Sequence, residues 1–566
     1  MTIKPTLMLF SLWIVFLVGV RPVKLGEDEL QQKYRADMNE TALAPVDSSL
    51  VGADVNGNAK TPELGADAYL QGKDSPLVSG RESRSAVEEL MHLVDGLKIE
   101  YRADIQLNAI ENRKITNRKL AEDIVHSLFN DAERATYPYP FVVTHGTSDT
   151  RDLAVAIVLS VFHLDALSIK LRAVQALMSW SSSKSLQQFQ SIHLAVPPTP
   201  CKTTLVPELS NYYAMFTGLA NSAVPSGAKM SDDLFFWINT QVQGMSSPLQ
   251  LAPMAASLKK LSVDANEFKT LADAYSARLA QLNATDRELA YMQKEQSLVN
   301  GIRALTARLR EESWPIAPLL QSYKVFLQNS AAQPSCSDTT ANWAEVLKSF
   351  NDLIEEYKLK DVGKLDRSHL ARSTQEGGRA DVLKPPDMTA LYAVLVKVDA
   401  VRSAREASES ASQIQDSSGW ESDVNGGLKA LDEIEPSRFD CYACAYTSKM
   451  SVLFAYFDEV PDKRWKERIL SDLVRNLADQ EMEKEAPVEW LFYVDILLNT
   501  ARKPSAEQQQ EIRRLEKAGK APNGLPSVLG AEIRQAMMRS GDNTLYLYAH
   551  ADEVLQTQYL MPPHPD

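Results

Sequence analysis

FKTLADAYSARLAQL, residues 268–282, carries its large apolar side chains at steps of three and four residues, at Phe268, Leu271, Tyr275, Leu279 and Leu282. This spacing places them on one face of an α-helix, because successive helix turns bring such positions together. Asp264 stands just before the period, and aspartate caps the free amides at a helix start. The segment therefore predicts an amphipathic helix that begins after Asp264.

The same period recurs along the chain after Ser85, in these sets: Leu120, Ile124 and Leu128; Trp343, Leu347, Phe350, Ile354 and Tyr357; Ile469, Leu473 and Leu477; Leu491, Val494 and Leu498. Ser231 and Ser247 stand before other apolar segments as candidate caps. Residues 149–162 are apolar nearly all round, which predicts a central, fully covered helix. Strand candidates are few, at residues 141–144 and 544–548.

Many links between these segments are short, as at His163-Leu164, and short links pack consecutive helices as antiparallel hairpins. Successive hairpins are spaced by about 35 to 45 residues, which is the range of helical-repeat arrays. We therefore predict an all-α fold: an irregular, solenoid-like array of antiparallel helical hairpins in two lobes. One or two compact helical bundles are the alternative, because no strict repeat signature is present.

Changes in composition divide the chain. Residues 36–85 are rich in Gly, Ala, Asp, Ser and Pro, and they cannot bury enough apolar surface to offset their conformational entropy. Residues 360–387 are rich in Gly and Pro, and residues 416–427 are rich in Gly and Ser. This composition is typical of surface loops and linkers. The predicted parts are a signal peptide or short membrane anchor at 1–24, a disordered spacer at 25–85, a helical-hairpin domain at 86–360, a linker at 361–427 with a helix near 387–415, a C-terminal helical domain at 428–560 and a tail at 561–566.

The uncharged apolar run TLMLFSLWIVFLVGV, residues 6–20, follows Lys4. It is shorter than the roughly 20 residues of a membrane-spanning helix, and its length is typical of the core of a secretory signal peptide. Arg21, Pro22 and Lys24 follow the run and leave a short uncleaved anchor or a buried core segment as alternatives. We predict a protein that is exported, to the periplasm or outside the cell, or that is anchored to the membrane by residues 6–20.

Composition argues against nucleic acid as a partner. The chain has 566 residues, with 60 Lys plus Arg against 74 Asp plus Glu, a net charge of -14 and a pI near 5.3. A nucleic-acid binder needs a basic face that replaces phosphate counterions. The chain also lacks a Gly-x-x-x-x-Gly-Lys loop and a Gly-x-Gly-x-x-Gly motif after a strand, so we expect no nucleotide and no other cofactor.

Four cysteines are too few for a disulfide-dense scaffold. Cys201 and Cys336 lie close after prolines in similar segments, PTPC and QPSC, and in an exported protein they are candidates for a bridge that closes a long loop. Cys441 and Cys444 form a Cys-x-x-Cys motif, and a helix that starts there lowers a thiol pKa through its dipole. This motif has three interpretations: a structural disulfide, a pair of reduced structural thiols, or a redox or metal function.

The sequence predicts no catalytic and no metal-binding residue. None of the eight histidines is paired as His-Glu-x-x-His or His-x-His, the local signatures of a zinc site. His145, Ser148 and Asp149 share one loop without a Gly-x-Ser-x-Gly elbow, and helix capping by Ser148 or Asp149 explains them. Ser226 and Lys229 form a Ser-x-x-Lys motif without the partner motifs of a serine acylase.

Two segments carry a resemblance: LDALSIKLRAVQALMSW, residues 164–180, and PPTPCKTTLVPELSNYYAMF, residues 197–216. They resemble a set of secreted bacterial helical-repeat proteins of the tetratricopeptide-like kind. The resemblance covers a small part of the chain and includes no catalytic motif. It implies a helical-repeat fold, and since that set has no assigned activity, it implies no site residue.

These features favour binding over catalysis, because helical arrays expose long surfaces on which a protein or peptide docks. We predict a binding protein or scaffold whose partner is another protein or a peptide, with membrane contact only through the N-terminal segment. The alternatives are a hydrolase with a cleft between lobes and a thiol redox protein that uses Cys441 and Cys444. Exposed aromatic residues mark interfaces, so five tryptophans are of interest, although most are expected in the core: Trp237, Trp314, Trp343, Trp465 and Trp490.

Overall fold

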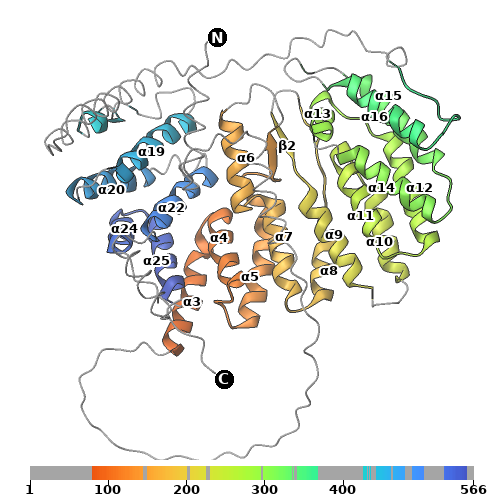
Figure 1. Cartoon of the computed structure of the whole chain (residues 1–566). Helices are drawn as coiled ribbons and strands as arrows, with labels where there is room; N and C mark the ends of the chain where they lie inside the picture. The colour runs from red at the N-terminus through yellow and green to blue at the C-terminus, as the bar shows by residue number, and fades with distance from the viewer. Residues whose placement is uncertain are drawn as a thin grey trace, which may run out of the picture. The chain divides into compact units, whose positions relative to one another are not determined.

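The computed structural model describes residues 80–143, 150–200, 204–224, 230–294, 297–333, 336, 341–366, 425–429, 431–432, 434, 442–459, 463–478, 487–502 and 528–557. All of them belong to one compact unit, Leu77–Asp566. Helices dominate this part of the chain (Figure 1). The elements are α3 (Gly80–Leu93), η1 (Val94–Gly96), α4 (Ile99–Glu111), α5 (Arg118–Asp131), η2 (Ala132–Arg134), β1 (Phe141–Val143), α6 (Thr150–Phe162), α7 (Ala166–Met178), α8 (Ser182–Gln190), β2 (Leu205–Pro207), α9 (Ser210–Ser222), α10 (Asp232–Gln243), η3 (Pro248–Gln250), α11 (Leu251–Lys260), α12 (Ala265–Gln281), α13 (Asp286–Lys294), α14 (Ser297–Glu311), α15 (Ala317–Ala331), α16 (Trp343–Glu356), α19 (Tyr442–Glu459), α20 (Lys463–Leu477), α22 (Pro487–Arg502), α24 (Val528–Arg539) and α25 (Asn543–Thr557).

Capping side chains begin helices where the sequence predicts them. At α10 the Ser231 hydroxyl accepts a hydrogen bond from Leu234 N. At α12 the side chains of Asp264 and Glu267 each accept a hydrogen bond from the backbone amide of the other residue. Both arrangements satisfy N–H groups that have no partner within the helix. The apolar period that follows Asp264 lines the buried face of α12, so the predicted amphipathic helix is confirmed.

Helices pack against one another in pairs, and two rows of helices can be followed through these contacts. In one row α7, α9, α11, α14 and α16 each pack against the next, and in the other α10 packs on α12 and α12 on α15. Gly301 of α14 allows a close approach, because a Cβ built there would lie 2.9 Å from Ala255 Cβ of α11. The prediction of a mostly helical fold made of packed helix pairs is confirmed (Figure 1).

The C-terminal helices pack beside the N-terminal ones. α22 packs against α4 and α6, α25 packs against α3 and α4, and α24 packs against both α22 and α25. Figure 1 shows these blue helices next to the orange ones. Their main packing partners outside the C-terminal region are thus the first helices of the described region.

β1 and β2 form a two-stranded antiparallel sheet in which Val142 lies opposite Val206. β1 confirms the strand predicted at residues 141–144. The sequence analysis did not predict β2, which is three residues long and ends at Pro207.

The strand predicted at residues 544–548 is wrong, because these residues belong to α25. Asp542 caps this helix by accepting a hydrogen bond from Leu545 N at 2.8 Å. Leu545, Tyr548 and Ala549 are buried together at helical spacing. A short alternation of apolar and polar residues was therefore overridden by the cap and by packing in the tertiary structure.

α6 differs from its prediction in two ways. The side chain of Val161 is 50% exposed, so the helix is not covered on every side, although Val155, Val158 and Leu159 are buried. The link to α7 is short, as predicted, but α6 packs against β1 and α22. His163 follows α6 with a φ of 53°, a left-handed conformation that commonly ends a helix. The short link therefore redirects the chain and does not form a tight hairpin.

Several predictions concern residues outside the described ranges: the apolar run at 6–20, most of the spacer at 25–85, most of the linker with its helix near 387–415, and the tail at 561–566. α3 begins at Gly80, within the predicted spacer, so helical structure starts before residue 86. Within the described ranges, no helix combines the length and the apolar character needed to cross a bilayer.

Candidate functional site

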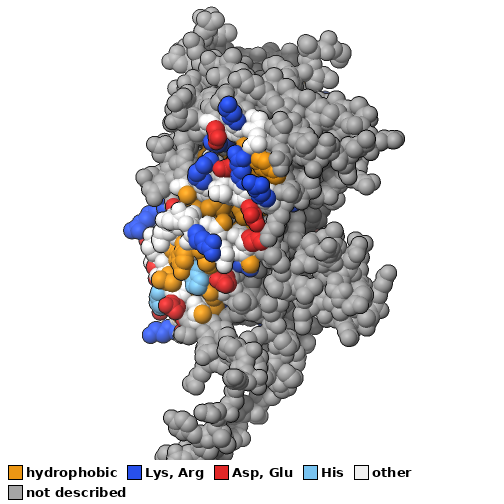
Figure 2. All heavy atoms as spheres, turned by 90° about the vertical axis from the view of Figure 1, so that its left-hand side faces the viewer, with side chains coloured by type: hydrophobic (Ala, Val, Ile, Leu, Met, Phe, Trp, Pro, Cys, Tyr) orange, Lys and Arg blue, Asp and Glu red, His pale blue; other side chains and the backbone are white. Residues whose placement is uncertain are grey.

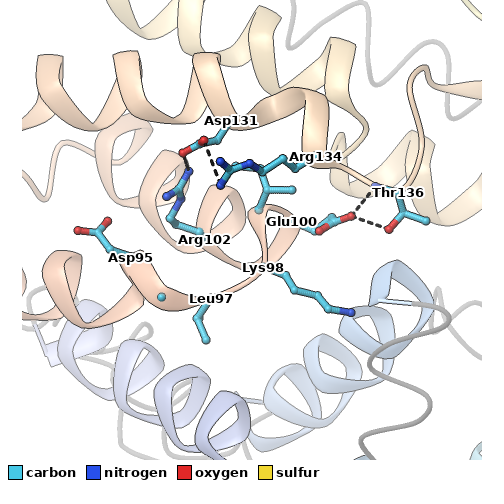
Figure 3. A pocket seen from close by; sticks show the side chains of 10 residues that line it. Asp95, Leu97, Lys98, Glu100, Arg102, Asp131, Arg134 and Thr136 are labelled. Carbon is cyan, nitrogen blue, oxygen red and sulfur yellow. Dashed lines mark hydrogen bonds and ion pairs between the residues drawn. The ribbon is translucent and has the colours of Figure 1, made fainter.

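A polar hollow of about 480 Å³ lies at the start of α4. Its residues come from η1, the first turn of α4, the end of α5, η2 and the turn after η2 (Figure 3). Leu97 is extended and lies between η1 and α4. The lining residues are Asp95, Gly96, Leu97, Lys98, Ile99, Glu100, Arg102, Asp131, Arg134 and Thr136.

Asp131 binds two arginines at one side of the hollow. Its Oδ2 lies 2.6 Å from Arg102 Nη2, and its Oδ1 lies 3.4 Å from Arg134 Nη1. The hydrogen bond from Arg102, together with the positive charges of both arginines, holds the pKa of Asp131 below its usual range. The Arg102 side chain is only 10% exposed, whereas that of Arg134 is 77% exposed. Arg134 is therefore the more accessible of these two cations to a molecule in solution.

Glu100 fixes the shape of the hollow. Its carboxylate is buried, and Oε1 accepts hydrogen bonds from Thr136 N at 2.7 Å and from Thr136 Oγ1 at 2.8 Å. These two bonds tie the turn after η2 to the first turn of α4, as Figure 3 shows. On the opposite side, Asp95 Oδ1 accepts a hydrogen bond from Gln106 Nε2 at 2.9 Å.

The hollow is suited to holding a hydrogen-bond acceptor. Each of its three acids already accepts hydrogen bonds from protein donors, whereas the N-cap residue of α4, Lys98, provides no side-chain cap. The first amides of a helix and its dipole attract negative groups, and Arg134 adds a positive charge. The ten lining residues include no His, Cys or Ser, so the nucleophiles sought in the sequence are not among them.

Buried carboxyl groups outside the hollow have raised pKa values, which is a signature of functional sites as well as of structural ones. Burial raises the pKa of Asp104 and that of Asp165 to about 6, and it also raises the pKa of Glu288. Asp165 caps α7, and Glu288 accepts a hydrogen bond from Thr199 N at 3.0 Å. These two acids therefore have structural roles, whereas Asp104 lies where α4 meets the C-terminal helices.

The cysteines are described only in part. Cys336 is buried and disulfide-bonded. Cys201 and Cys441 lie outside the described residues, and the side chain of Cys444 in α19 is not described. The pairing of Cys201 with Cys336 and the role of Cys441 and Cys444 stay predictions.

The serine and histidine motifs also fall outside the described residues. This applies to the loop with His145, Ser148 and Asp149 and to Ser226 with Lys229, so the hydrolase alternative stays untested. Among the residues that the structure does describe, no three His, Cys, Asp or Glu are grouped to hold a metal ion.

The tryptophans divide between core and boundary. Trp343 and Trp490 are buried. The half-buried ones are Trp237, Trp314 and Trp465. Phe236 of α10 is far more accessible, at 72% exposed. The face seen from the side of α20 and α24 shows apolar, basic and acidic side chains intermixed (Figure 2), so its described residues do not form a patch of one kind.

Sequence reasoning missed every residue of the hollow. Arg102, Asp131 and Thr136 belong to no motif, and only folding brings them next to residues 95–100. No protein-family model, no curated protein and no solved structure matches the chain. The resemblance to secreted bacterial helical-repeat proteins therefore stays an expectation.

Proposed function

We propose that this protein binds a protein or peptide partner on the surface of an irregular, solenoid-like array of helical hairpins. The two rows of packed helices support the array, since rows of this kind leave extended faces for a partner. We also propose that the chain is exported, or anchored through residues 6–20, so that it meets this partner outside the cytoplasm.

The hollow at the start of α4 carries the proposal. The partner places a carboxylate, from an acidic side chain or a chain end, next to Arg134 and the first amides of α4. An exposed ion pair contributes only about 0 to 1 kcal/mol, so this contact selects the partner and its orientation, and the affinity comes mainly from the extended helical surface.

Affinity purification tests this function. The full chain is used to recover partners from the native envelope fraction, in parallel with Arg134→Glu and Lys348→Glu. Lys348 is the matched control, because its side chain is 76% exposed on α16 and pairs with Asp352. We expect the wild type and Lys348→Glu to recover one stoichiometric partner. Arg134→Glu should recover about tenfold less of it, because a glutamate repels the carboxylate of the partner where the arginine attracts it. Recovery of no partner, or equal recovery with both variants, contradicts the proposal.

A further inference from the structure

Three aromatic side chains hold distant parts of the chain together where α4 meets α22 and α25, which we name the α4–α22–α25 junction. The Tyr101 ring of α4 lies 5.0 Å from Trp490 of α22 and 6.0 Å from Tyr548 of α25, measured between ring centroids. All three are buried, and Trp490 Nε1 donates a hydrogen bond to Leu477 O. Buried aromatic surface is thus the main source of stability at this contact.

Asp104 lies one helix turn after Tyr101, at the polar edge of the junction. Its Oδ1 accepts a hydrogen bond from Asn108 Nδ2 at 2.8 Å, and the Tyr548 hydroxyl lies 3.5 Å from its Oδ2. The negative charge of Asp495 on α22 also acts on Asp104. The charge of Asp104 is therefore disfavoured by a second carboxyl group, which comes from a helix far away in the sequence.

Arg172 of α7 is a cation that faces Asp104, but its guanidinium is engaged elsewhere. Its Nε and Nη2 lie 2.9 Å and 3.0 Å from the two carboxylate oxygens of Glu111. Nη2 also donates to Asn108 Oδ1 at 3.1 Å. Arg172 thus offsets the charge of Asp104 only in part.

The other ionisable groups around α4 add little positive charge. Burial and the nearby Arg172 lower the pKa of His163, so this residue is neutral at pH 7. Burial raises the pKa of Tyr548 well above its usual value, so its hydroxyl keeps the proton. Further charged groups close to the junction are already paired: Asp131 with Arg102, Asp95 with Gln106, and Asp552 with Arg534.

We propose that the α4–α22–α25 junction is a pH-responsive latch, which holds α22 and α25 most firmly on α4 when Asp104 carries a proton and loosens when Asp104 is ionised. Loosening uncovers the aromatic contact between Tyr101, Trp490 and Tyr548. The inference rests on the geometry of this junction and is independent of the proposed binding function.

The direction of the pH effect follows from proton linkage. In the closed junction the pKa of Asp104 is about 6, mainly because of burial, whereas its ordinary value is 3.8. Closing therefore takes up a proton between these two pH values. The latch is strongest at acid pH and weakens as the pH rises to about 6. Between pH 5 and pH 7.5 the closing equilibrium falls about tenfold.

Hydrogen exchange of the full chain tests the latch. The protection of residues 99–111 and 487–502, relative to that of residues 343–356 of α16, is measured at pH 5 and pH 7.5, after correction for the intrinsic exchange rates. The reference helix removes the pH dependence of global unfolding, to which Asp165 contributes. We expect about tenfold greater protection at pH 5 in the wild type. Asp104→Asn keeps the shape and the acceptor oxygen but cannot ionise, so its protection is expected to be the same at both pH values.

Asp165→Asn is the matched control, because Asp165 is also buried and its pKa is also raised to about 6, but its hydrogen bond caps α7 through Ser168 N and involves none of the three junction aromatics. This variant is expected to keep the tenfold difference. If Asp104→Asn does not fold, Asp495→Asn takes its place in the experiment. It removes the like charge near Asp104 and is expected to reduce the pH difference in protection. The proposal is overturned if the wild type is equally protected at both pH values. It is also overturned if Asp104→Asn or Asp495→Asn keeps the full pH difference in protection, or if Asp165→Asn loses it.

Discussion

At the scale of single residues, Asp165 shows how one buried carboxyl group makes folding depend on pH. Its Oδ1 accepts a hydrogen bond from Ser168 N at 2.8 Å, but its Oδ2 has no hydrogen-bond partner. Burial raises its pKa from 3.8 to about 6, so the folded protein binds this proton more tightly than the unfolded chain does. The contribution of Asp165 to the free energy of unfolding is therefore present in full below pH 3.8 and is lost as the pH rises to about 6.

Replacing Asp165 by Asn should remove this pH dependence, because the amide keeps the capping oxygen and does not ionise. The wild type should lose about 2 kcal/mol of unfolding free energy through this group between pH 4 and pH 7.5. Urea unfolding of both proteins at the two pH values measures the difference. If Asp165→Asn loses as much stability as the wild type, burial of Asp165 is not the cause.

At the scale of helices, two glycines on helices of the same row have opposite surroundings. A Cβ at Gly301 of α14 would lie 2.9 Å from Ala255 Cβ and 3.4 Å from Ala252 O of α11. A Cβ at Gly218 of α9 would meet nothing within 4 Å. Gly301 therefore sets the distance between two helices, whereas Gly218 affects only its own helix.

Alanine at the two positions should change stability in opposite directions. Gly218→Ala should raise the free energy of unfolding by about 0.5 to 1 kcal/mol, because alanine favours the helix. Gly301→Ala should lower it by about 1 to 3 kcal/mol, because α11 and α14 must move apart. Urea denaturation measures both variants. If the two variants are equally stable, α11 and α14 can move apart without a loss of unfolding free energy.

At the scale of the whole molecule, Trp490 connects the C-terminal helices to α4 through its contact with Tyr101. Trp490→Ala should lower the free energy of unfolding by about 3 to 5 kcal/mol, because it removes a fully buried side chain. Hydrogen exchange should increase at residues 99–111 of α4, far away in the sequence. It should increase less at residues 343–356 of α16, which packs against α14. An equal increase at both would mean that the described helices open as one unit.

Local signals predicted the individual helices well. Ser231 and Asp264 cap α10 and α12 as expected, because a cap needs only neighbours in the sequence. Residues 544–548 were assigned to a strand because five residues do not separate a helical period from an alternating one. The hollow was not foreseen, since Arg102 and Asp131 approach each other only after α4 and α5 have packed.

By itself, the sequence determined the helical character, the helix starts and the acidic composition, because these depend on residue type and on spacing over a few turns. Only the tertiary structure decided that α22 and α25 pack on α4, that Asp104 lies beside the hydroxyl of Tyr548 there, and that a hollow opens beside Glu100. The apolar faces of different helices share the same residue spacing, so the spacing does not say which two faces meet. That depends on how the side chains fit together across the whole core.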